Sequence, residues 1–177
     1  MISDFIKGKK QFDFPEDIRK GIMLHRQIDT FTDDHPVTKE AKKIFSAHYR
    51  LYSGPFIDVV YDHFLANDKT IFTEISLKAF ASRSYDTLDS YFDVLPPSFK
   101  QMLPYMKKHN WLLGYRFYTG IENSFAGIAH RAKFITESQT AFALFKENYQ
   151  TLQQYYNEFF PMLKEFCLDS LRLIQKG

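Results

Sequence analysis

Apolar residues recur every three or four positions along nearly the whole chain, which is the spacing of amphipathic helices. Strand signals are nearly absent, because no segment alternates apolar and polar residues between Asn-Gly or Asp-Gly turns. Prolines mark helix starts, since proline fits the first helical turn and disrupts the interior. The pattern predicts helices over 15–32, 36–52, 55–65, 76–92, 97–108, 110–134 and 137–175.

The last predicted helix, 137–175, is the longest, and we expect Pro161 to kink or divide it. Within 110–134 the chain has three glycines, which allow bends or the close approach of another segment: Gly114, Gly120 and Gly127. We find no linker, internal repeat or low-complexity tract. The sequence therefore predicts one all-α domain over 1–177, a helical bundle of about seven or eight helices.

Composition fits a globular protein and excludes several classes. Hydrophobic residues make up 45% and charged residues 25%, while the 18% of aromatic residues predicts a core packed through large rings. A net charge of +2 provides no field that would attract nucleic acid. Cys167 is the single cysteine, which excludes an intramolecular disulfide and a cysteine-based zinc site. We expect neither a signal peptide nor a transmembrane helix, and a cytoplasmic location.

The first cluster of candidate chemistry lies near the end of the predicted helix 15–32. His25 and Asp29 are four residues apart, so they share one helix face and lie about 6 Å apart along its axis. Asp33 continues that line if the helix persists. Such a pair is also typical of helix surfaces, and Asp33 is equally suited to cap the helix that begins near Pro36.

The second cluster lies in the predicted helix 55–65. Asp58 and Asp62 are again four residues apart, and His63 follows directly. Side chains of neighbouring helical residues diverge by about 100°, so one can bind a metal while the other orients a neighbour. Imidazole and carboxylate groups together suit Mn²⁺, Mg²⁺, Fe²⁺ or Zn²⁺. Two helices that meet in a bundle can present such ligands to one site.

Four motifs, in order along the chain, carry a family resemblance: Ser3-Asp4-Phe5-Ile6-Lys7-Gly8, His25-Arg26-Gln27-Ile28-Asp29, Asp62-His63-Phe64-Leu65 and Leu113-Gly114-Tyr115-Arg116. Together they resemble the acyl carrier protein phosphodiesterase family, which is similar to the His-Asp group of metal-dependent phosphohydrolases. The family pattern also has a short segment, with its own histidine, before the Asp4 motif. Because this chain starts at Met1, we expect that segment to be absent.

The resemblance implies hydrolysis of the phosphodiester that joins 4′-phosphopantetheine to acyl carrier protein. It implies Mn²⁺, with Mg²⁺ and Fe²⁺ as alternatives. The implied metal-binding residues are Asp4, His25, Asp29, Asp62 and His63. We expect Arg26, Asp62 and His63 to be catalytic, and we expect Lys42, Lys43 and Arg116 to bind the substrate through their positive charge. For Arg26, contact with a phosphoryl group and an ion pair with Asp29 or Glu40 remain equal alternatives.

Acyl carrier protein is the partner that the resemblance implies, and neither nucleic acid nor a membrane is expected. Carrier proteins are acidic, so clustered basic residues, with Lys42 and Lys43 among them, are candidates for a complementary surface. Two other functions remain open. The chain is also compatible with a related phosphohydrolase that acts on a nucleotide or small phosphodiester, or with a helical carrier-protein-binding protein that has lost catalysis. The sequence gives no indication of the oligomeric state.

Overall fold

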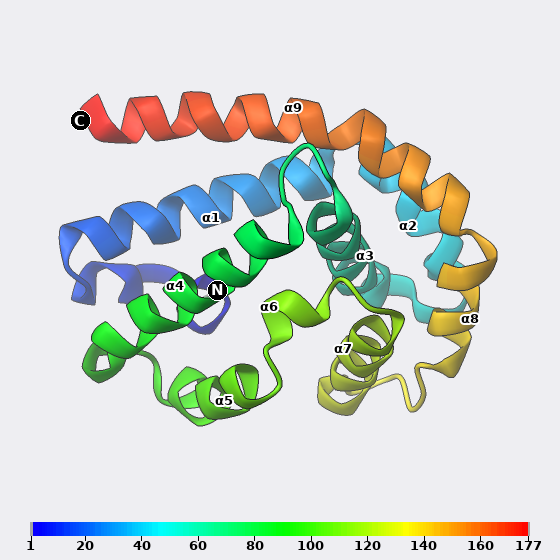
Figure 1. Ribbon diagram of the computed structural model, residues 1–177, viewed down its shortest axis with the longest axis horizontal. Coiled ribbons are helices and arrows are strands. Elements are labelled where there is room, and N and C mark those ends of the chain that lie inside the picture. The colour runs from blue at the N-terminus through cyan, green and yellow to red at the C-terminus, as the bar shows by residue number, and fades with distance from the viewer. Residues whose placement is uncertain (1, 177) are drawn as a thin grey trace.

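The computed structural model describes residues 2–176 and confirms the all-α fold; this part of the chain contains no strand (Figure 1). The α-helices are α1 (Glu16–Asp34), α2 (Pro36–Tyr49), α3 (Ser53–Asn67), α4 (Glu74–Ser90), α5 (Pro97–Lys108), α6 (Trp111–Gly114), α7 (Tyr118–Arg131), α8 (Gln139–Glu147) and α9 (Tyr149–Lys176). Short 3₁₀ helices accompany them: η1 (Ser3–Phe5), η2 (Gly8–Asp13), η3 (Arg50–Tyr52) and η4 (Phe92–Val94). None of the helices in residues 2–176 combines the length and apolar character needed to cross a membrane.

Prolines and capping side chains set the helix starts. Pro15 directly precedes α1, and Pro36 and Pro97 are the first residues of α2 and α5, as the sequence predicts. Thr73 caps α4 reciprocally with Ser76, because each side chain accepts a hydrogen bond from the other residue's backbone N–H. These local signals explain why most predicted starts agree with the structure to within two residues.

The break between α2 and α3 comes earlier than predicted. The sequence places it at 53–55, but α2 ends at Tyr49 and η3 forms the connection, so α3 already includes Ser53. Arg50 makes the turn with φ 47° and ψ −116°, in a region that residues other than glycine rarely adopt. The connection therefore depends on a strained backbone rather than on a glycine or proline.

The predicted helix 110–134 is divided into α6 and α7. Its glycines explain the geometry, because a Cβ atom at Gly120 would lie 2.0 Å from the carbonyl oxygen of Gly114. Any larger residue at 120 would collide with backbone, so the close approach predicted for these glycines is confirmed at this pair.

The predicted helix 137–175 is also divided, between α8 and α9, and this adds to the helix count of residues 2–176. The division falls at Asn148, and Pro161 lies inside α9. The prediction that the helix divides at this proline is therefore wrong. Figure 1 shows α9 changing direction partway along its length, which agrees with the alternative expectation of a kink in a helix that carries an interior proline. The two additional breaks give nine α-helices within residues 2–176, instead of about seven or eight.

Two hydrophobic clusters form the interior. The larger is built from α2, α3, α7, α8 and the first half of α9, and its fully buried rings include Phe45, Phe56, Phe125, Phe145 and Phe159. The smaller is built mainly from α4 and α5, with partly buried residues of η1 and α6 packed against it. The predicted aromatic core is thus confirmed. Helices α1 and α9 run antiparallel, side by side, along one edge of the molecule (Figure 1).

Candidate functional site

A cavity of about 1020 Å³ lies between the two hydrophobic clusters. Its charged lining comes from η1, α1, α2, η3 and α3, and its apolar lining includes residues of α4, α5 and α6 as well as of α3 and α9. The ionisable groups that line it are Asp4, His25, Asp29, Asp33, Lys42, Arg50, Asp58, Tyr61, Asp62 and Tyr115. Five carboxylates thus share the cavity with one lysine and one arginine, a charge imbalance that favours a bound cation.

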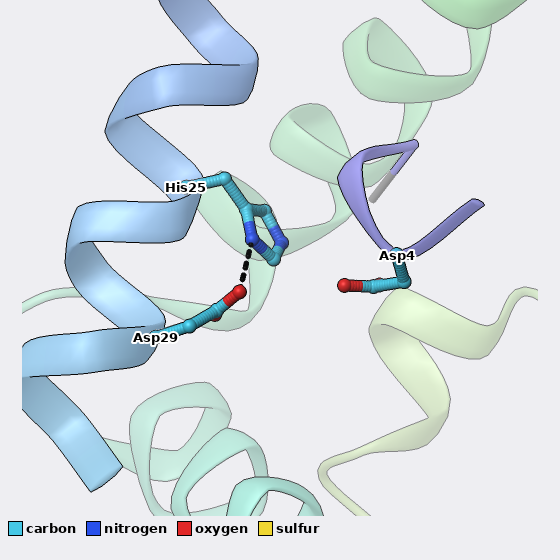
Figure 2. Close-up of side chains that lie close together, drawn as sticks. All are labelled: Asp4, His25 and Asp29. Carbon is cyan, nitrogen blue, oxygen red and sulfur yellow. Dashed lines mark hydrogen bonds and ion pairs between the residues drawn. The ribbon is translucent and has the colours of Figure 1, made fainter. Parts of the chain in front are cut away.

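Three of the predicted metal-binding residues converge on this cavity. Asp4, His25 and Asp29 each offer one ligand atom, and these atoms all lie within 4.8 Å of one another. His25 and Asp29 lie on the same face of α1, with His25 Nδ1 2.9 Å from Asp29 Oδ2, while Asp4 approaches from η1 (Figure 2). One imidazole and two carboxylates form a donor set that suits a divalent ion such as Mn²⁺, Fe²⁺ or Zn²⁺.

Arg26 holds the N-terminal segment that carries Asp4. Its guanidinium donates to the backbone carbonyl oxygen of Ile6 at 2.6 Å and to Oε1 of Gln11 at 2.9 Å. Arg26 does not line the cavity, and the ion pair with Asp29 or Glu40 does not form in residues 2–176. The guanidinium connects two segments of the chain instead of forming the predicted ion pair, and its contact with a phosphoryl group stays a prediction.

Asp62 faces the cavity from α3. Burial raises the pKa of its carboxyl group to about 7, and the neighbouring Tyr115 hydroxyl offsets part of this rise. A part of the Asp62 side chain remains accessible to solvent, so the group can exchange a proton with the cavity. Near neutral pH both its acid and its base forms are populated, which suits a proton-transfer role.

Asp58 lies one turn before Asp62 and lines the same cavity. Although the residue is exposed to solvent in the cavity, the protein around its carboxyl group removes part of the hydration and raises its pKa, and the negative charges of Asp62, Asp33 and Asp29 raise it further. The residue belongs to the second sequence motif, yet sequence reasoning did not select it as a site residue. Its four-residue spacing from Asp62 was the signal that could have identified it.

His63 points away from the cavity and is 2% exposed. Its Nδ1 lies 2.7 Å from the carbonyl oxygen of Tyr115, and its Nε2 lies 3.1 Å from the hydroxyl of Tyr149. Nδ1–H donates to the carbonyl, which leaves Nε2 as an acceptor for the hydroxyl. Burial lowers the pKa of His63 and keeps the ring neutral. With both nitrogens bonded to protein, the predicted metal-binding and catalytic roles of His63 are contradicted by this arrangement.

The three predicted substrate-binding residues do not form one surface. Lys42 lines the cavity and pairs with Asp33 at 2.7 Å. Lys43 is exposed and pairs with Glu40 at 2.7 Å. Arg116 is half-buried, lies outside the cavity lining and approaches a carboxylate of α4 at 3.6 Å. Only Lys42 is therefore positioned to contact a ligand in the cavity.

Arg50 is a second cation of the cavity lining, and sequence reasoning did not include it among the site residues. The adjacent Leu51 also lines the cavity and is 94% exposed. Both residues belong to the strained connection η3, whose conformation has no signal in the sequence. Backbone strain of this kind is often located at functional sites.

Comparison with known proteins gives a consistent result. Residues 1–163 match the family model described as acyl carrier protein phosphodiesterase. A protein of that name from Yersinia pestis is 30% identical over 164 residues, covering 92% of this chain and 85% of the relative. One from Yersinia enterocolitica is 30% identical over 170 residues, with 96% and 88% covered, and one from Photorhabdus laumondii is 26% identical over 166 residues, with 93% and 84% covered. No solved structure matches.

The family match spans the elements that build the cavity, from η1 through the first half of α9. It includes Asp4, His25 and Asp29, which come from segments that only the folded chain brings together. The chain therefore belongs to the acyl carrier protein phosphodiesterase family.

Proposed function

We propose that this protein hydrolyses the phosphodiester between 4′-phosphopantetheine and a serine of acyl carrier protein. A water oxygen forms a bond to phosphorus while the bond from phosphorus to the serine oxygen breaks. The serine oxygen takes up a proton, so the products are 4′-phosphopantetheine and apo-acyl carrier protein. The observation that carries this proposal is the convergence of Asp4, His25 and Asp29 in a large cavity, in a chain of this family.

The donor set fits the divalent metal that the family resemblance implies, with Mn²⁺ as our proposed ion. Asp4, His25 and Asp29 would hold it, since they offer one nitrogen and two oxygen ligands within 4.8 Å of one another. A bound divalent ion supplies two effects at such a site: it neutralises charge on phosphoryl oxygens and lowers the pKa of water. This chemistry is shared with the His-Asp phosphohydrolases and forms part of the proposal.

Proton transfer is assigned to Asp58 and Asp62. Hydrolysis requires a group that accepts a proton from water and a group that returns one to the serine oxygen. Both carboxyl groups line the cavity, and the pKa of each is raised to about 7 by loss of hydration, with neighbouring negative charges adding to the rise at Asp58. We assign the two steps to these carboxyl groups jointly, because they share the cavity and the negative charge of Asp62 raises the pKa of Asp58.

We assign two roles to the cations Lys42 and Arg50. They contact the substrate phosphate, and they contact the carrier protein at the entrance of the cavity. Both line the cavity, whereas Arg26 and Arg116 do not. Arg50 is exposed, so it can also contact acidic residues of the partner outside the cavity. Such contacts mainly raise the association rate and weaken with salt.

The test is to incubate the protein with holo-acyl carrier protein and Mn²⁺, with and without chelator, and to follow the mass of the carrier. We expect loss of the phosphopantetheine mass, and no loss with chelator or with Asp29→Asn. The matched control is Asp34→Asn, because Asp34 lies on the same helix, is exposed and does not line the cavity. If the carrier mass stays unchanged with wild-type protein, or if both variants are equally inactive, the proposal is refuted.

A further inference from the structure

One side of the cavity is apolar and has no role in the hydrolysis described above. We name its side chains on α4, α5 and α6 and in the loop before α4 the apolar lobe; they are Phe72, Leu77, Phe80, Met106, Trp111 and Leu112. Leu77 and Met106 are 3% and 5% exposed, whereas Phe80 is 42% exposed. The lobe therefore has a buried floor and an accessible edge, which is the form of a binding site for an apolar group.

Contacts within the protein fix the lobe in place. The Phe72 and Phe80 rings pack against each other with their centroids 5.4 Å apart. The backbone N–H of Leu112 donates to the hydroxyl of Tyr85 at 3.1 Å, which attaches α6 to α4. Met106 belongs to the smaller hydrophobic cluster. A site whose walls are already packed loses little conformational entropy when a ligand binds.

The apolar lobe adjoins the acidic part of the cavity. Tyr115 follows α6 directly, three residues after Leu112, and its hydroxyl neighbours the Asp62 carboxylate. Tyr115, Leu112 and Asp62 all line the cavity. A molecule with its phosphate among the carboxylates therefore has the apolar lobe beside it for the group attached to that phosphate.

We infer that the apolar lobe binds the pantetheine arm of the substrate, an inference that rests on the proposed function. The arm carries a dimethyl-substituted carbon one methylene group beyond its phosphate oxygen, followed by a hydroxyl-bearing carbon and two amides joined by methylene groups. Apart from the Trp111 indole, the lobe side chains carry no N–H or O–H group. They suit the dimethyl-bearing part of this arm better than the sugar of a nucleoside, whose hydroxyls lie at a similar distance from the phosphate and would lose hydrogen bonds to water without replacement. The lobe thus selects the pantetheine phosphodiester over nucleotides and small phosphodiesters.

Trp111 permits a direct binding test, because it is the only tryptophan of the chain. We would titrate the protein with 4′-phosphopantetheine, and separately with AMP, while recording tryptophan fluorescence in the presence of Mn²⁺. We expect a saturable change with 4′-phosphopantetheine and a much weaker response to AMP at the same concentrations. This measurement needs no turnover, so it does not depend on hydrolysis.

Two variants of α4 locate the binding. Phe80→Ala removes a ring from the accessible edge and should weaken binding of 4′-phosphopantetheine about tenfold, the loss expected for one aromatic contact. Ile75→Ala is the control, because Ile75 is 82% exposed on the same helix and does not line the cavity. It should bind like wild type. Circular dichroism of both variants verifies that they fold.

The outcomes separate the two proposals. A Trp111 response that Phe80→Ala weakens supports the lobe assignment, whether or not holo-acyl carrier protein is hydrolysed. Hydrolysis of holo-carrier with no Trp111 response and an unchanged KM in Phe80→Ala overturns the lobe assignment and leaves the proposed function intact. Equal responses to AMP and 4′-phosphopantetheine overturn the selectivity that we infer.

Discussion

Replacing Asp62 with asparagine should stabilise the metal-free protein. In the folded state burial raises the pKa of this carboxyl group to about 7, against 3.8 for the same group in the unfolded chain. Above pH 7 the folded protein must therefore keep a charge that burial disfavours. Asparagine has nearly the same shape, carries no charge and can still accept a hydrogen bond from the Tyr115 hydroxyl.

The magnitude follows from these two pKa values. At about 1.4 kcal/mol for each pKa unit, the difference corresponds to an upper value of about 4 kcal/mol. Solvent in the cavity reaches part of Asp62 and screens its charge, so we expect about half, near ~2 kcal/mol. For a chain of this size such a gain raises Tm by about 4–8 °C.

The effect has a defined pH dependence. Because the folded-state pKa is raised, folded Asp62 holds more protons than unfolded Asp62 between pH 3.8 and about 7. The destabilisation by Asp62 is therefore complete above pH 7 and declines as the pH falls toward 3.8. At pH 5 the advantage of Asp62→Asn should be about half of its value at pH 8.

Thermal unfolding followed by circular dichroism at pH 8 and pH 5, with chelator present, measures both values. Asp86→Asn is the control, since Asp86 is an exposed carboxylate of α4 outside the cavity and should change stability by less than about 0.5 kcal/mol. The same Asp62→Asn variant should lose hydrolysis of holo-acyl carrier protein. A variant that is no more stable than wild type at pH 8, or equally stabilised at both pH values, would refute the reasoning.

Three further predictions concern other positions. Asp4→Ala should weaken Mn²⁺ binding at least tenfold in calorimetry, because it removes one of three ligands; unchanged affinity would exclude Asp4 from the site. His63→Phe should lower the free energy of unfolding in urea by about 3 kcal/mol, because the Tyr115 carbonyl loses its donor; a loss below about 0.5 kcal/mol would contradict the structural role of His63. Gly120→Ala should destabilise by more than about 2 kcal/mol, since its Cβ would lie 2.0 Å from the Gly114 carbonyl oxygen; Gly21→Ala, with nothing within 4 Å, should be neutral or stabilising, and equal effects would refute the clash.

The sequence predicts the fold well where a helix boundary is encoded locally. Pro15, Pro36 and Pro97 define starts through their missing N–H and fixed φ, and these agree with the structure. The breaks at 115–117 and at Asn148 were missed, because apolar spacing continues across both. There the chain bends so that segments pack against distant helices, and such tertiary packing leaves no periodic signal.

The site, like the fold, is predicted where the signal is local in the sequence and is missed where it depends on tertiary contacts. His25 and Asp29 follow from their four-residue spacing on one helix, and the structure places them together. The adjacent pair Asp62 and His63 shows the limit of such reasoning. Neighbouring side chains on a helix diverge by about 100°, so only one of the two could face the cavity, and the sequence does not reveal which. The role of Arg26 required coordinates, because its partners lie 15 and 20 residues away.

The Arg26 contacts couple metal affinity to the position of an arm of the chain. Residues 3–13 carry Asp4, and Arg26 holds this arm through Ile6 and Gln11, in the same helical turn that presents His25. An ion that needs Asp4 binds more tightly when the arm is docked, so by thermodynamic linkage each event strengthens the other. A substitution remote from the ligands that loosens the docking of this arm would then lower the metal affinity, as the loss of a ligand would. Excess metal would restore both the docked position of the arm and the activity.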